Sequence, residues 1–101
     1  MKKTIYYRLE YSRMSGTHFV KADGYLDVDT DIVYQKRSEY GKIWKATDYA
    51  TGILIPTRDS NTMKECQERV ARVMDTVNRK RETPEYKQSS ENLYQYCLTQ
   101  Y

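Results

Sequence analysis

The chain has 101 residues, enough for one domain with a single core. Leu, Ile, Val and Phe together account for only 17 residues, which is typical of disordered chains when the net charge is also high. Here the formal net charge is +3, and 11 Tyr residues, one Trp and one Phe supply further apolar area. We therefore expect a folded α+β domain that uses Tyr both in its core and on its surface.

The sparse histidine and cysteine content argues against several kinds of site. His18 is the single histidine and Cys66 and Cys97 are the two cysteines, so a zinc site would lack a full set of nitrogen and sulfur ligands. The sequence contains no apolar run long enough to cross a membrane and no secretory signal pattern. We expect a cytoplasmic protein without cofactors, in which both cysteines are buried free thiols.

Residues 4–56 have the patterns of an antiparallel sheet of four to five strands. Residues 4–12 alternate between two faces, with Tyr7 on the face expected to meet a helix and Tyr6 on the other. Ser15-Gly16 then predicts a turn. Asp23-Gly24 predicts a tight hairpin, because a type I′ turn requires positive φ at both central residues.

The later part of the sheet region is less regular. Residues 29–40 suit a strand, a loop or a short helix. Extended segments are expected at residues 18–22, 25–28, 42–48 and 53–55. Pro56 ends the last of these because it cannot donate a ladder hydrogen bond.

The main helix is predicted over residues 62–81. Thr62 and Glu65 form a capping box, in which each side chain accepts a hydrogen bond from the other residue's amide. An apolar stripe follows at helical spacing, formed by Cys66, Val70, Val73, Met74 and Val77. This stripe predicts a helix packed on the sheet.

A second helical region begins at Thr83-Pro84, with Thr83 as N-cap and Pro84 at the first helical position. Residues 87–92 are polar enough to be loose. From Leu93 the apolar spacing predicts a short C-terminal helix that docks on the domain or on a second copy. The chain is therefore expected to be a monomer or a homodimer through this segment.

The sequence contains little that points to catalytic groups. Asp27, Asp29 and Asp31 would share one face of a strand and could hold Mg²⁺ in a nuclease, but a calcium loop fails because Ile32 stands where Gly is required. His18 has no activating partner nearby in the sequence. We expect no catalytic and no metal-binding residues.

Basic and aromatic side chains alternate around residues 34–45, as in proteins that bind single-stranded nucleic acid. The candidate nucleic-acid contacts are Lys36, Arg37, Lys42 and Lys45. Acidic residues within the same region and a pI of 8.8 argue against strong binding.

The tyrosines themselves predict a protein-binding face, since Tyr offers large amphipathic area with few torsions to restrict. The candidate partner contacts are Tyr6, Tyr34, Tyr40, Trp44 and Tyr49. The competing interpretation is that an aliphatic-poor domain uses these rings to fill its core.

Residues 42–80, with Trp44-Lys45-Ala46-Thr47-Asp48, Thr51-Gly52-Ile53-Leu54-Ile55 and a capped charged helix from Thr62, carry a pattern of strand, turn, strand and helix. This layout resembles small accessory proteins of phages and mobile elements of Gram-positive bacteria, some of which are anti-CRISPR or other anti-defence inhibitors. The resemblance implies a non-catalytic protein that binds and blocks a host nuclease effector in the host cytoplasm. The alternatives are a small nucleic-acid-binding regulator and a metal-dependent nuclease.

Overall fold

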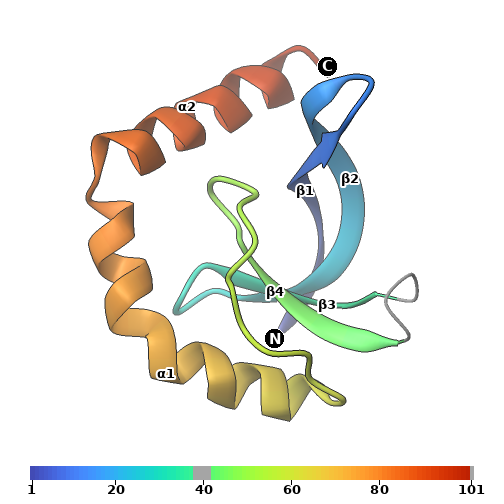
Figure 1. Ribbon diagram of the computed structural model, residues 1–101, viewed down its shortest axis with the longest axis vertical. Coiled ribbons are helices and arrows are strands. Elements are labelled where there is room, and N and C mark those ends of the chain that lie inside the picture. Colours follow the sequence, from blue (N-terminus) through green and yellow to red (C-terminus); the bar gives the residue numbers. More distant parts are fainter. Residues whose placement is uncertain (38–41, 101) are drawn as a thin grey trace.

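The computed structural model describes residues 1–37 and 42–100, which form a four-stranded antiparallel sheet and two helices (Figure 1). The strands pair in chain order and are β1 (Lys2–Ser12), β2 (Gly16–Asp27), β3 (Ile32–Arg37) and β4 (Ile43–Asp48). The helices are α1 (Met63–Arg81) and α2 (Pro84–Leu98). The predicted α+β class with an antiparallel sheet is confirmed.

β2 is one continuous strand, so the hairpin turn predicted at Asp23-Gly24 is wrong. A Cβ atom on Gly24 would lie 2.6 Å from Val33 Cγ1 and 3.1 Å from Tyr6 Cε1. The glycine is therefore needed for close packing across the strand rather than for a turn. Tyr6 and Val33 are both buried, and the strand register places them on the face of the sheet opposite Tyr34.

The chain turns instead after Asp27, whose carboxylate accepts a hydrogen bond from the Asp29 amide at 3.0 Å. Asp31 completes this turn with a φ of 56°. Within the ambiguous stretch of residues 29–40, β3 runs from Ile32 to Arg37, so this part is a strand.

The sheet is strongly curved, so the turn after β4 contacts β1. The Leu9 amide donates to the Gly52 carbonyl at 2.8 Å, and Gly52 has a φ of +77°. The predicted strand at 53–55 is present as a short flanking segment: the Ile55 amide donates to Ala46 at 2.9 Å, and Leu54 forms an isolated bridge. Figure 1 shows this segment running between the helices and the β1–β2 hairpin.

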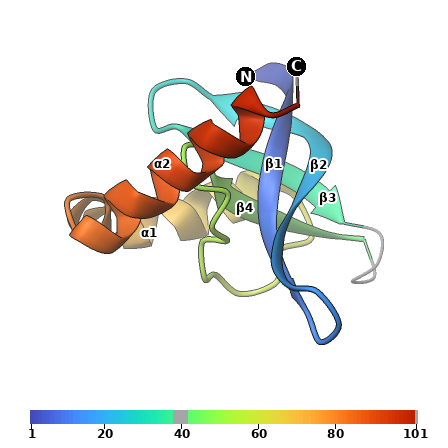
Figure 2. The same ribbon diagram turned by 90° about the horizontal axis from the view of Figure 1, so that it is seen from above.

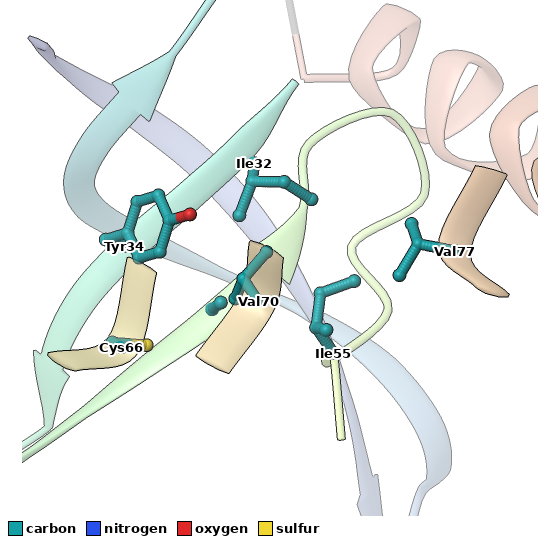
Figure 3. Close-up of a cluster of buried hydrophobic side chains, with 7 residues drawn as sticks. Ile32, Tyr34, Ile55, Cys66, Val70 and Val77 are labelled. Atoms are coloured by element: carbon teal, nitrogen blue, oxygen red, sulfur yellow. The ribbon is translucent and has the colours of Figure 1, made fainter. Parts of the chain in front are cut away.

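α1 covers β3 and β4 with the apolar stripe that the sequence predicted. Thr62 Oγ1 accepts from the Glu65 amide at 3.1 Å, so the helix begins at the predicted cap. Figure 3 shows the resulting core, built from β3, the segment after β4 and α1. Its buried members are Ile32, Tyr34, Ala46, Ile55, Cys66, Val70 and Val77.

α2 is continuous from Pro84 to Leu98, so residues 87–92 are helical rather than loose. Thr83 caps it as predicted, with its hydroxyl accepting from the Tyr86 amide at 3.4 Å. The ring of Tyr96 lies 5.6 Å from that of Tyr7 on β1, and α2 therefore packs on the β1–β2 hairpin (Figure 2).

Candidate functional site

Two of the predicted partner contacts, Tyr6 and Tyr34, are core residues with exposed fractions of 2% and 3%. The strand register places them on opposite faces of the sheet. Tyr34 lies beneath α1, and the Tyr6 hydroxyl donates to Gln35 Oε1 at 2.7 Å. Their expected role at a partner surface is therefore corrected: these rings supply interior volume that the few aliphatic residues do not.

The other three predicted contacts have different positions. Trp44 is partly buried and packs against the α1 core, with its ring 6.3 Å from that of Tyr25. Tyr49 is 38% exposed in the turn after β4. Tyr40 lies outside the described residues. The structure thus separates Trp44 from Tyr49 instead of joining them in one surface.

Exposed aromatic and apolar side chains gather elsewhere, at a groove of about 450 Å³ between α2 and β1. Ile5 is 52% exposed and Tyr94 is 59% exposed, and both line it together with Tyr49. The complete lining is Ile5, Tyr6, Tyr7, Lys21, Tyr49, Ala50, Ser90, Leu93, Tyr94 and Cys97. We call this site the tyrosine groove.

The groove exists because α2 meets the sheet at a few points only. The ring of Tyr96 packs edge-on against that of Tyr7 and at a tilt against that of Phe19, with centroids 5.6 and 4.9 Å apart. Leu93 is 7% exposed and Tyr94 is 59% exposed, and both line the groove. The helical spacing of Leu93 and Cys97 indicated a docking helix, but it did not indicate which strand the helix would meet.

A charged anchor at the other end of the helices positions the turn that carries Tyr49. Asp48 is 1% exposed, and Arg81 donates to its Oδ1 atom from Nη2 at 2.7 Å and from Nε at 3.0 Å. Thr51 donates to the second carboxylate oxygen at 2.7 Å. The last residue of α1 is therefore bound to the end of β4, which fixes the groove wall.

The four candidate nucleic-acid contacts do not form one patch. Arg37 is buried and its Nη2 pairs with Glu10 Oε1 at 2.9 Å, while Lys45 pairs with Asp59 at 2.8 Å. Alternation along β3 puts Lys36 on the face opposite Arg37. Lys36 and Lys42 are exposed. The cations are therefore divided between the faces, and two of them neutralise carboxylates.

The acidic and nucleophilic candidates are also dispersed. Asp27 ends β2 and Asp29 and Asp31 lie in the turn after it, so the three do not share one face of a strand. In the part of the chain that the structure describes, no cluster of three His, Cys, Asp or Glu residues could hold a metal ion. His18 Nδ1 lies 3.3 Å from the Gly16 carbonyl oxygen, within its own strand.

The two cysteines differ in environment. Cys66 on α1 is fully buried, as predicted, and burial raises the pKa of its thiol above the ordinary value. Cys97 on α2 is partly exposed and lines the tyrosine groove, so the expectation of a buried thiol is corrected there. Burial likewise raises the pKa of Tyr34 to about 12, with Cys66 and Asp27 adding to the effect.

Comparison with known protein families, curated proteins and solved structures gives no match to this chain. Within residues 1–37 and 42–100, neither helix is long and apolar enough to cross a membrane. The functional argument therefore rests on the geometry of the tyrosine groove and on the residue pattern of the chain.

Proposed function

We propose that this chain is a non-catalytic binding protein whose contact surface is the tyrosine groove and its rim. The observation that carries the proposal is that several exposed apolar side chains lie together around one groove. Ile5, Tyr49 and Tyr94 are all at least 38% exposed around the groove, and Leu98, one turn beyond Tyr94, is 51% exposed. Apolar side chains exposed together mark protein-binding sites on soluble domains.

The chemistry of the lining favours binding over catalysis. Among the described residues that line the groove, Lys21 alone carries a charge at neutral pH. The rest are aromatic, aliphatic or small, which suits an apolar side chain of a partner protein inserted between β1 and α2. Tyrosine is among the residues that most often carry the affinity of protein interfaces, and Tyr49 and Tyr94 both line this groove.

The class of partner comes from the resemblance of residues 42–80 to anti-defence inhibitors. On that basis we propose that the partner is a bacterial nuclease effector of the anti-CRISPR target class, blocked by stoichiometric binding. A net charge of +3 does not suit an acidic mimic of DNA. An apolar groove suits contact with the nuclease protein itself.

The test uses purified CRISPR effector nucleases and measures both complex formation and cleavage. We expect one effector to bind at fixed stoichiometry by calorimetry and to lose its nuclease activity. Tyr94→Ser and Ile5→Ser should weaken binding about tenfold or more, since each removes an apolar anchor. Tyr11→Ser and Met14→Ser are matched controls, because both residues are well exposed and neither lines the groove.

Two results would contradict the proposal. One is equal loss of binding in the groove variants and the controls, which would place the contact elsewhere. The other is binding to an oligonucleotide with an affinity that falls steeply with salt, which would favour the alternative of a nucleic-acid-binding regulator. A groove-mediated protein complex should respond little to salt.

A further inference from the structure

A second depression, of about 300 Å³, lies beside the middle of α1 and gathers three arginines. It is lined by Pro56, Thr57, Arg58, Arg69, Arg72 and Val73. We call it the arginine pocket. None of these six residues lines the tyrosine groove, so the inference below does not depend on the proposed function.

Two of the three guanidinium groups are unpaired. Arg58 and Arg72 are exposed, and no carboxylate in residues 1–37 or 42–100 forms an ion pair with either. The acidic residue beside Arg58, Asp59, pairs instead with Lys45 at 2.8 Å. Glu68 precedes Arg72 by one helical turn without pairing to it. The pocket therefore has two positive charges with free donors.

Arg69 has a different role, because its side chain already joins α1 to the preceding segment. Its Nη1 donates to Ser60 Oγ at 3.0 Å and to the Asp59 carbonyl oxygen, and it pairs with Glu65 at 2.8 Å. These contacts hold residues 57–60 against the helix. Arg58 and Arg72 therefore line the same pocket even when no ligand is bound.

Thr57 provides a separate indication. Its hydroxyl oxygen is buried and has no hydrogen-bond partner among the described residues. Buried polar atoms of this kind are rare in native proteins and indicate a missing partner. Thr57 itself lines the arginine pocket, so its side chain is beside the place where a ligand would bind.

We propose that the arginine pocket binds the phosphate group of a phosphate monoester. A monoester has three terminal oxygens and close to two negative charges at neutral pH, so it can accept from Arg58 and Arg72 together and from the Thr57 hydroxyl. A carboxylate has only two oxygens and satisfies one guanidinium fork. Pro56 and Val73 provide an apolar wall for the organic part of the ligand.

The experiment titrates the full chain with phenyl phosphate at low salt and follows backbone amides by NMR. We expect saturable shifts at residues 57, 58 and 72, and weaker binding at pH 5 than at pH 7.5, because the second pKa of a phosphate monoester is about 6. Arg58→Gln combined with Arg72→Gln should weaken binding about tenfold or more. Arg13→Gln combined with Arg79→Gln is the charge-matched control and should change it less than about twofold.

Thr57→Val tests the hydroxyl separately. Because this atom has no partner among the described residues, the variant should keep the melting temperature and still weaken phenyl phosphate binding several-fold. Equal loss in both double variants, or no saturable binding at millimolar phenyl phosphate, would overturn the proposal. Tighter binding of an oligonucleotide, whose internal phosphates are diesters, with the same loss in the Arg58 and Arg72 variant would overturn it in favour of a nucleic-acid backbone site.

Discussion

The two helices pack on the same sheet in very different ways. α1 places Cys66, Val70 and Val77 at exposures of 4% or less, and its last residue binds the buried carboxylate of Asp48. α2 buries Leu93 and leaves Tyr94 more than half exposed beside a groove. The difference follows from periodicity: α1 carries a full apolar stripe, whereas α2 mixes rings with polar residues.

This contrast assigns most of the stability to the α1 interface and the proposed binding to the α2 interface. A helix with a continuous buried stripe contributes most of the core and leaves little room at its interface. A helix held by a few aromatic contacts leaves a space between itself and the sheet, and in this protein the exposed side chains of Ile5, Tyr49 and Tyr94 line that space. We therefore expect substitutions under α1 to affect folding and substitutions under α2 to affect binding.

The largest expected effect comes from a matched pair of isoleucines. Ile32→Ala should lower the free energy of unfolding by about 2–5 kcal/mol, because the side chain is fully buried beneath α1 and its loss leaves a cavity. Ile5→Ala removes the same atoms from a half-exposed position beside α2 and should cost less than about 1 kcal/mol. Urea denaturation followed by circular dichroism measures both. Similar losses would contradict the contrast between the helices.

Arg81→Ala should be the next most severe change. It leaves the Asp48 carboxylate buried with Thr51 as its remaining side-chain donor among the described residues, at a cost of about 2 kcal/mol. Arg79→Ala is the control, because Arg79 is exposed and contacts Thr76 within the helix. Thermal unfolding of both variants at neutral pH gives the comparison. A null result for Arg81→Ala would mean that α1 depends on its apolar stripe alone.

Alkaline pH sharpens the contrast through Tyr34. Its pKa of about 12 lies above the ordinary value of 10.0, so the folded state holds this proton more tightly than the unfolded state. The resulting stability is complete below about pH 10 and is lost as pH rises toward 12, by on the order of 2 kcal/mol. Tyr34→Phe should therefore flatten this part of the curve of stability against pH, measured by urea denaturation.

The smallest structural effect concerns the two thiols, one on each helix. A thiol reagent should modify Cys97 in the native protein, because this side chain is partly exposed in the tyrosine groove. Cys66 should react only as fast as the core opens, since it is fully buried and its pKa is raised. Mass spectrometry of the labelled chain with time distinguishes the two. Fast labelling of Cys66 would show that α1 is less firmly packed than its burial indicates.

Much of the fold was predictable because it depends on neighbours in the chain. The alternation of residues 4–12, the cap at Thr62 and the α1 stripe are local patterns, and each predicted its element correctly. Fewer of the residues that line the candidate site were predictable. Tyr49 lines the groove as part of a tyrosine surface, but Ile5, Tyr94 and Cys97 were not among the expected contacts.

The remaining errors concern contacts between distant parts of the chain. Asp23-Gly24 has the local signature of a turn, yet the close approach of Tyr6 and Val33 gives Gly24 a packing role inside a strand. In the sequence, the cations of the 34–45 region resemble one patch. In the structure, Arg37 instead pairs with Glu10, which lies 27 residues earlier in the chain. A glycine or a charged residue can have several structural roles, and contacts with residues far away in the chain decide which role it has.

Local periodicity in the sequence by itself determined the class of the fold and most of its elements, since helix hydrogen bonds and the side-chain spacing of helices and strands depend on nearby residues. Only the tertiary structure decided which tyrosines are interior and which are exposed. A tyrosine side chain is compatible with both environments, so its burial depends on what packs against its part of the curved sheet. α1 covers Tyr34 completely, and α2 leaves Tyr49 and Tyr94 open at the groove.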